Sequence, residues 1–183
     1  LHYNNLDFFF INQYIMKYTY LKAKDWFHPK IKRKNHKITI GDNSKRIQKI
    51  FNIIKTFLLR ASDPNKYLAG IDFEFNRVNN KRQIALCQIN LEDLTTEADI
   101  VFFDPKMLNK SQMSIFKKLL IHNKVSKILH GGESLDLPYL FNNVLTTLKE
   151  QKQFSKNFFD TKFLCDFYNL KEKGNIRCKI NYL

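Results

Sequence analysis

The stretch that begins at Tyr67 constrains the fold more than any other part of the chain. Its segments YLAGIDFEF, QIALCQINL and DIVFFDP are apolar and separated by polar turns, which predicts three consecutive strands. Helical spacing over 111–122, 134–149 and 160–170 then alternates with short strands over 127–130 and 157–159. The order βββαβαβα predicts an α/β fold in which helices flank one mixed five-stranded sheet.

The first third of the chain has a different pattern. Residues 6–26 and 44–60 both show helical spacing, and the basic segment between them, which contains Pro29, reads as a connection. Asp63 and Pro64 then supply turn chemistry, after which the strands begin. We therefore predict a helical, basic N-terminal extension over residues 1–62 and the main domain over residues 63–183.

Positive charge is concentrated in that first third. The chain carries 31 Lys and Arg against 17 Asp and Glu, a formal net charge of +14, and most of the surplus lies before residue 61. Such a surplus attracts polyanions through the release of counterions, so the charge taken alone favours a nucleic acid or an anionic membrane surface as a partner. A solvated surface in a lysine-rich chain is the alternative. The candidate phosphate-binding residues are Lys32, Arg33, Lys34, Lys45, Arg46 and Lys49.

Several classes of protein are disfavoured by what the sequence lacks. The three cysteines, Cys87, Cys165 and Cys178, are scattered and form no CxxC pair, so neither a disulfide framework nor a thiolate zinc site is indicated. The chain has no apolar run of the ~20 residues that a membrane span needs and no secretion signal. We expect an intracellular protein of the cytoplasm or nucleus without a membrane partner, and leave its oligomeric state open. Because the first residue is Leu1 and not Met, we expect a processed chain, an engineered fragment or a piece of a longer reading frame.

Two acidic residues on one strand are the first candidate site. Asp72 and Glu74 stand two apart in IDFEF, so they share one face of the strand, while Phe73 and Phe75 take the buried face. Neighbouring carboxylates repel each other, and a hard divalent cation such as Mg²⁺ relieves that repulsion. The alternative is an edge strand with two solvated acids.

Two later segments carry further acids. In KILHGGESLDLPYLF a strand ends at His130, two glycines follow, and Ser134 could cap a helix that bears Asp136. Asp136 could reach the same cation, or could be an N-terminal acid that the helix dipole stabilises. His130 is expected to be a packed, hydrogen-bonded residue at a strand end, and Asp160 in NFFDTKF a helix cap.

Taken in order, these segments resemble the DEDD superfamily of 3′-to-5′ exonucleases, in particular its RNase D-like branch, over about residues 66–170. One departure is visible: HGGESLD holds one more residue between its His and Asp than the usual pattern of the branch. The matching positions are Asp72 and Glu74 in the DxE strand, Gln88 in the next strand, His130, Asp136 and Leu140 in the second motif, and Phe159, Asp160 and Thr161 in an FDT segment.

The resemblance implies an RNase H-like fold and a metal-dependent 3′-to-5′ exonuclease that acts on the 3′ end of single-stranded RNA or DNA. It further implies two Mg²⁺ or Mn²⁺ ions and a two-metal mechanism. In that mechanism Asp72 would bridge both ions, Glu74 would hold one and orient the attacking water, and Asp136 would bind at the second. His130 and Asp160 would support this site.

The same resemblance shows what the chain lacks. The last motif of the family is a helix with a Tyr or His shortly before a fourth metal-binding Asp, and no such helix is found before Leu183. We therefore expect a domain that is incomplete at its C-terminus and a poor catalyst as given. The alternative is a catalytically inactive nuclease fold that binds nucleic acid or a protein partner. An RNase H-like endonuclease or polynucleotidyl transferase would not explain HGG followed by FDT.

Overall fold

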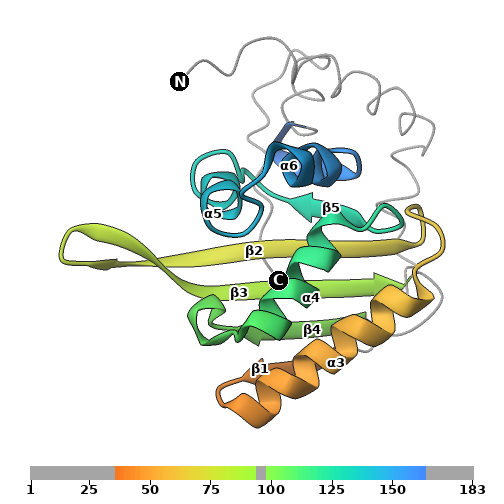
Figure 1. The fold of residues 1–183 in the computed structure, drawn as a ribbon, viewed down its shortest axis with the longest axis horizontal. Coiled ribbons are helices and arrows are strands. Elements are labelled where there is room, and N and C mark those ends of the chain that lie inside the picture. Colours follow the sequence, from red (N-terminus) through yellow and green to blue (C-terminus); the bar gives the residue numbers. More distant parts are fainter. Residues whose placement is uncertain (1–35, 94–97, 164–183) are drawn as a thin grey trace, which may run out of the picture. The chain divides into compact units, whose positions relative to one another are not determined.

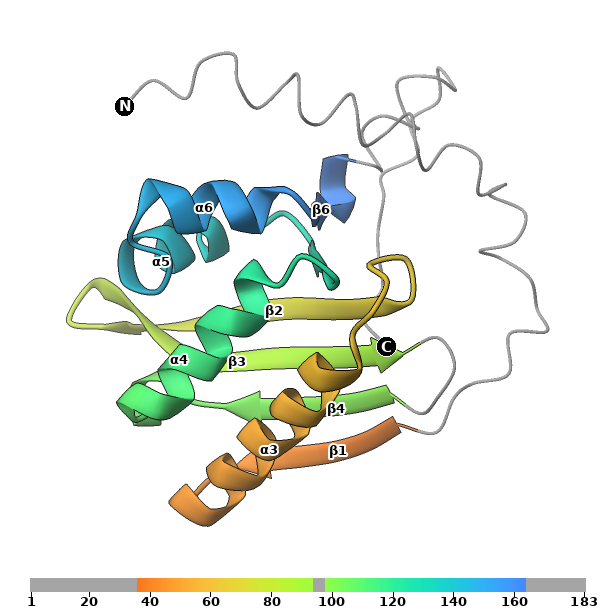
Figure 2. The same cartoon turned by 45° about the vertical axis from the view of Figure 1, so that its right-hand side comes forward.

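A computed structural model describes residues 36–93 and 98–163, so the predicted helix over 6–26 lies outside the described residues. Figures 1 and 2 show one sheet with helices packed against it. Its strands are β1 (His36–Gly41), β2 (Tyr67–Val78), β3 (Lys81–Asp93), β4 (Ala98–Phe103), β5 (Ser126–Leu129) and β6 (Phe158–Asp160). The helices are α3 (Ser44–Arg60), α4 (Lys110–Ile121), α5 (Asp136–Asn143) and α6 (Leu148–Ser155), with a 3₁₀ turn η1 (Pro105–Met107). No helix among these is long and apolar enough to cross a bilayer.

The sheet is mixed, as predicted. Its strand order is β1-β4-β3-β2-β5-β6. β3 runs antiparallel to both β2 and β4, whereas β5 is parallel to β2, and β6 to β5. Asn79 and Asn80, with φ angles of 49° and 60°, form the tight turn between β2 and β3. The carboxyl ends of β5 and β6 lie side by side in this arrangement, level with the part of β2 that follows Gly70.

The predicted strand count was wrong, because the sheet has six strands and not five. The additional strand is β1, which pairs in parallel with β4 at the register Ile38↔Ile100. Its sequence, HKITIG, is short and adjoins the lysine-rich segment, so no local pattern revealed a pairing across some sixty residues. Residues 36–60, assigned from the sequence to the extension, thus add a strand and a helix to a compact unit that spans residues 34–183.

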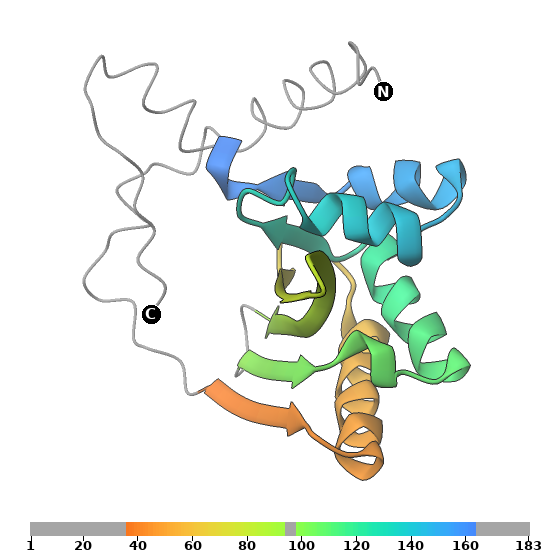
Figure 3. The same ribbon diagram turned by 90° about the vertical axis from the view of Figure 1, so that its left-hand side faces the viewer.

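Helix α3 covers the sheet with an apolar stripe. Its residues Ile47, Ile50, Phe51, Ile54 and Phe57 are all buried. The helix is capped by Asn43, whose side chain accepts a 3.0 Å hydrogen bond from the backbone N–H of Arg46. Figure 3 shows α3 and α4 together on one face of the sheet. That face holds the core.

Aromatic rings join the layers of this core. The ring of Phe103 in β4 lies 5.5 Å from that of Phe51 in α3 and 5.7 Å from that of Phe116 in α4. Phe73 in β2 lies 6.4 Å from Phe116 and 5.2 Å from Tyr139 in α5. The two pairs that Phe116 makes are edge-to-face, and such pairs add about 0.5–1.5 kcal/mol each beyond the area they bury.

The helix predicted over 134–149 is two helices. α5 ends at Asn143 and α6 begins at Leu148. Thr147 starts the second helix through a capping box, in which its hydroxyl accepts from Glu150 N and the Glu150 carboxylate accepts from Thr147 N. The turn between them lets α6 pack beside β5, where Phe154 is fully buried.

A buried cation lies between β5 and α6. The side chain of Lys127 is fully buried, and its Nζ donates to the carbonyls of Val125 at 3.0 Å and His122 at 3.3 Å. The ammonium also lies 5.9 Å from the centre of the Phe154 ring. Burial lowers the pKa of Lys127 from 10.5 to about 7.

This lysine makes the stability of the protein depend on pH. Between the folded pKa of about 7 and the ordinary value of 10.5, the unfolded chain binds more protons, so stability rises with pH in that window. We expect the free energy of unfolding, from urea titrations between pH 6 and 10, to rise by up to ~4 kcal/mol more in the wild type than in Lys127→Met. Parallel pH profiles for the two proteins would contradict this.

Candidate active site

Asp72 and Glu74 lie on the face of β2 that turns away from α3 and α4. Phe73 between them is 5% exposed and packs on Phe116 of α4, so its neighbours point to the other face of the sheet. β2 lies between β3 and β5 in the strand order, but β5 pairs only with Leu68–Gly70, so both acids lie just beyond that pairing. Asp72 is half-buried opposite Gln88 of β3, whereas Glu74 is exposed beside a bulge in the β2–β3 pairing.

Asp136 is the first residue of α5 and is buried, with 8% of its surface exposed. The expected cap from Ser134 is not made, because Leu135 precedes the helix without a side-chain hydrogen bond. Burial and, to a smaller extent, the negative charges of Asp72, Asp160 and Glu74 together raise the pKa of Asp136 to about 7. Asp136 is therefore a carboxyl group that a nearby cation would stabilise in its ionised form.

Asp160, at the end of β6, clamps the glycine turn that follows β5. Its two carboxylate oxygens accept 2.8 Å hydrogen bonds from the backbone N–H groups of Gly131 and Gly132. The same carboxylate accepts from Lys162 N at 2.9 Å, the capping contact that the sequence predicted. Gly131 has a φ of +65°, a conformation that favours glycine, and a Cβ on Gly132 would meet Leu129 at 2.8 Å.

His130 joins the same pair of segments. Its Nδ1 lies 2.8 Å from the hydroxyl of Thr161, and that hydroxyl donates to the carbonyl of Leu129 at 3.2 Å. Because the hydroxyl has one hydrogen, the His130 Nδ1 must be the donor in the first of these contacts. The histidine is thus the hydrogen-bonded strand-end residue that the sequence led us to expect. An ion pair between Lys162 and Glu133 closes the turn.

We expect the clamp to stabilise the fold strongly. Asp160→Ala leaves two buried N–H groups without acceptors, so it should lower the free energy of unfolding by about 3 kcal/mol in a urea titration. Glu133→Gln removes only the exposed ion pair with Lys162 and serves as the control, with a loss of at most ~1 kcal/mol. Equal losses in the two variants would refute the role of the clamp.

The described candidate phosphate-binding residues lie on the opposite face of the sheet from Asp72 and Glu74. Lys45, Arg46 and Lys49 are exposed on α3, which covers the face of the sheet opposite Asp72 and Glu74. Arg46 also pairs with Asp42 at 2.5 Å. Lys32, Arg33 and Lys34 lie outside the described residues. The described basic residues are thus separated from the carboxylates by the thickness of the sheet.

The donors around Asp136 suit a hard cation by their chemistry, since all of them are carboxylates. Within residues 36–93 and 98–163, however, no group of three or more His, Cys, Asp or Glu side chains is placed so that it could hold a metal ion. The fit to a divalent ion therefore depends on the type of the donors and on the mutual repulsion that raises the pKa of Asp136.

Sequence reasoning missed the bonds between the second motif and the FDT segment. It treated Asp160 as a local cap, and it gave Thr161 no partner. The available signal was the pair of glycines after His130, because a turn with free N–H groups at the end of a parallel strand calls for an acceptor from the next strand. Lys127 gave no signal, since a lysine in a short strand is usually exposed.

Comparison with models of known protein families identifies the family of this chain. A family model described as 3'-5' exonuclease matches residues 53–183, which is more than half of the chain. The chain belongs to the 3′–5′ exonuclease family. The family generally uses divalent metals. The matched region contains Asp72 and Glu74 of β2, Asp160 of β6 and the glycine turn described above.

One curated relative extends this finding. An uncharacterized protein of Acanthamoeba polyphaga mimivirus, L533, is 34% identical over 132 residues, which is 69% of this chain and 25% of the relative. The chain thus spans about a quarter of the length of that protein.

Three solved structures are similar in fold. They are the EXO domain of Aedes aegypti Nibbler (TM-score 0.44, 10% identity, 81% of this chain and 61% of that one), the EXD2 exonuclease domain soaked in Mg and GMP (0.45, 18%, 75% and 64%) and the Trypanosoma brucei RNase D and GMP complex (0.47, 10%, 71% and 34%).

Proposed function

We propose that this protein hydrolyses the phosphodiester bond at the 3′ end of single-stranded nucleic acid, RNA or DNA, with the help of Mg²⁺ or Mn²⁺. The observation that carries the proposal is the buried carboxyl group of Asp136, whose pKa is raised by burial and by three other carboxylates, in a chain of the 3′–5′ exonuclease family. Such an arrangement of carboxylates is costly unless a cation offsets it.

Asp72, Glu74 and Asp136 are the residues that would hold the two ions. When bound, divalent ions of this kind activate water and stabilise the leaving oxygen at phosphorus. Asp72 and Glu74 present their carboxylates from the rigid centre of the sheet, and Asp136 from the start of α5. The site is supported by the hydrogen bonds of Asp160, His130 and Thr161, which hold the turn that leads to Asp136.

The direct test is the polarity of degradation. Oligonucleotides of RNA and of DNA, labelled at the 5′ end, are incubated with the protein and Mg²⁺ or Mn²⁺, and the products are resolved on a gel. We expect a ladder that shortens from the 3′ end, and none with excess chelator or with a 3′-phosphorothioate terminus. Internal cleavage, or a ladder that persists in chelator, would reject the proposal.

An inactive fold that binds nucleic acid is the second candidate, and the exposed basic side chains of α3 favour it. Binding without cleavage at saturating protein, in every metal tested, would be the expected result for such a module. The position of α3 on the face away from the acids permits this role independently of catalysis.

The basic face of α3 has its own test. If Lys45 and Lys49 contact phosphates, Lys45→Gln/Lys49→Gln should flatten the dependence of log affinity for a single strand on log salt by about 1.4, at ~0.7 per contact. Fluorescence anisotropy, recorded at salt concentrations from about 50 to about 300 mM, measures this slope. Lys152→Gln/Lys156→Gln on and beside α6 is the matched control, since both lysines are exposed. Equal slopes would mean that α3 carries a solvated face only.

A further inference from the structure

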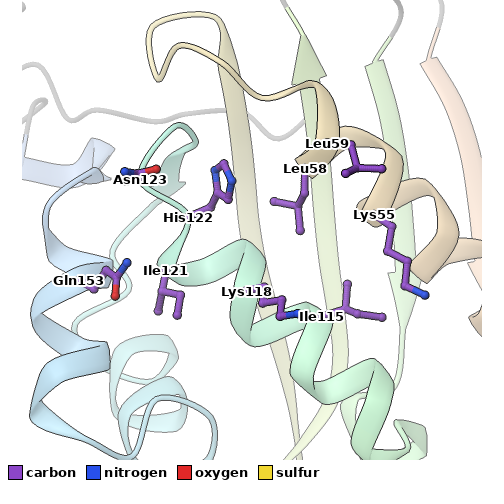
Figure 4. Close-up of a pocket in the computed structure, with 9 residues that line it drawn as sticks. All are labelled: Lys55, Leu58, Leu59, Ile115, Lys118, Ile121, His122, Asn123 and Gln153. Atoms are coloured by element: carbon purple, nitrogen blue, oxygen red, sulfur yellow. The ribbon is translucent and has the colours of Figure 1, made fainter.

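A groove of about 570 Å³ runs between α3 and the α4–β5 segment, on the face of the sheet away from the acids (Figure 4). Its apolar residues come from both helices: Leu58 and Leu59 from α3, Ile115 and Ile121 from α4. Leu59 is 89% exposed, which is far more than a large apolar side chain of an amphipathic helix usually shows. The groove thus leaves apolar surface open to solvent.

The charged rim of the groove has a single sign. Lys55 of α3 and Lys118 of α4 line it, and no Asp or Glu among the described residues does. Both lysines are exposed, and neither forms an ion pair in the part of the chain that the structure describes. The neighbouring Lys117, by contrast, is neutralised by Glu150 at 2.8 Å. Two free cations therefore stand beside open leucine side chains.

We propose that this groove, defined by Lys55, Leu58, Leu59, Ile115, Lys118 and Ile121, is a docking site for an acidic amphipathic helix of a partner protein. Apolar residues at helical spacing would cover Leu58 and Leu59, and Asp or Glu on the flanks of the helix would pair with Lys55 and Lys118. An apolar groove with a cationic rim is complementary to this class of segment.

Charge argues against the other occupants. A second copy of the chain carries a net charge of +14 and would bring further cations to the same rim. A nucleic acid would satisfy the lysines, but its phosphates would leave the leucines uncovered. Because the groove lies away from Asp72 and Glu74, a partner bound there would leave the acids accessible.

The test is a selection from a displayed library of 14-residue peptides with apolar residues at helical spacing and a free mixture of Glu, Lys and Ser elsewhere. The full chain is the bait, and Lys55→Glu/Leu59→Ser/Lys118→Glu is used for counter-selection. Lys81→Glu/Arg82→Glu, with both changes in the exposed β2–β3 hairpin, is the matched control. All three substitutions in the groove variant are on exposed side chains, and circular dichroism verifies that it folds.

We expect Glu-rich apolar peptides to be enriched. A synthetic copy of the best one should bind the wild type and the hairpin control equally in fluorescence anisotropy, and the groove variant at least tenfold more weakly. A copy with Lys in place of Glu should prefer the variant Lys55→Glu/Lys118→Glu.

Three outcomes would overturn the proposal. They are a selection that enriches no peptide over the counter-selection, enrichment of basic peptides, and binding that the groove variant retains. Two further results would overturn the proposal in favour of a nucleic acid or a second copy of the chain as the occupant. One is a loss of single-strand binding in the groove variant without a loss of peptide binding. The other is a dimer in sedimentation analysis that Leu59→Ser dissociates. None of these results depends on nuclease activity.

Discussion

Asp72→Asn is expected to lower the metal-dependent release of nucleotides from a labelled strand by about a thousandfold or more. The charge that Asp72 supplies to a divalent ion is worth several kcal/mol of transition-state stabilisation, and each ~1.4 kcal/mol is tenfold in rate. The change replaces the carboxylate by an amide of the same shape, at a position of β2 that pairs with Gln88 of β3. The fold should therefore survive with little change in stability.

The measurement pairs activity with metal binding. Mn²⁺ affinity by calorimetry and the rate of 3′ release should fall together in Asp72→Asn, while the free energy of unfolding stays within ~1 kcal/mol of the wild type. Asp99→Asn is the control and should change neither the Mn²⁺ affinity nor the rate of 3′ release. Asp99 lies level with Ala69 in the sheet, three residues away from Asp72. Unchanged Mn²⁺ affinity in Asp72→Asn would remove this residue from the proposed site.

Asp136→Asn is expected to stabilise the metal-free protein while it abolishes its response to metal. The pKa of Asp136 rises from 3.8 to about 7 because the side chain is buried and lies near Asp72, Asp160 and Glu74. Between these values the folded protein holds a proton that the unfolded chain has lost. The stability from this group is therefore present at pH 4 and is lost as the pH rises through 7.

An asparagine does not titrate, so the variant should lose this pH dependence. At about 1.4 kcal/mol per pKa unit, the free energy of unfolding of the variant should exceed that of the wild type by up to ~4 kcal/mol at pH 8 and match it near pH 4. Urea titrations at both pH values measure this. A variant that is less stable than the wild type at pH 8, without metal, would contradict the expected repulsion.

Divalent metal should reverse the order of stability of the wild type and Asp136→Asn. A divalent ion that binds the folded state stabilises it in proportion to the logarithm of its concentration over the dissociation constant. Millimolar Mn²⁺ should therefore raise the melting temperature of the wild type and leave that of Asp136→Asn nearly unchanged. This comparison separates a carboxylate that binds an ion from one that is merely buried.

Much of the site could be predicted because it depends on neighbours in sequence. Asp72 and Glu74 share a face because strand residues alternate, and Phe73 is buried for the same reason. The apolar stripe of α3 follows from helical spacing alone. Five of the six strands have apolar runs that are bounded by polar turns. The family resemblance depended on the same local segments.

Local pattern was insufficient where two distant segments meet. The break between α5 and α6 depends on the capping box of Thr147 and Glu150, which outweighs a helical pattern that continues through it. β1 forms because β4 offers it an edge. Its Ile38 and Ile40 are exposed and Thr39 between them is buried, which is the reverse of the burial that apolar and polar residues usually show in a strand. Its own propensity is too weak to decide.

Local patterns in the sequence were enough to establish which side chains carry charge, which residues alternate along β2, and the succession of strands from Tyr67 onward. Only the tertiary structure decided that Asp160 bonds to Gly131 and Gly132, and that α3 puts its lysines on the face away from Asp72. The physical reason is the range of the interactions. Alternation and helical spacing act between neighbours, whereas pKa shifts, hydrogen bonds between strand ends and the placement of a helix depend on groups that only folding brings together.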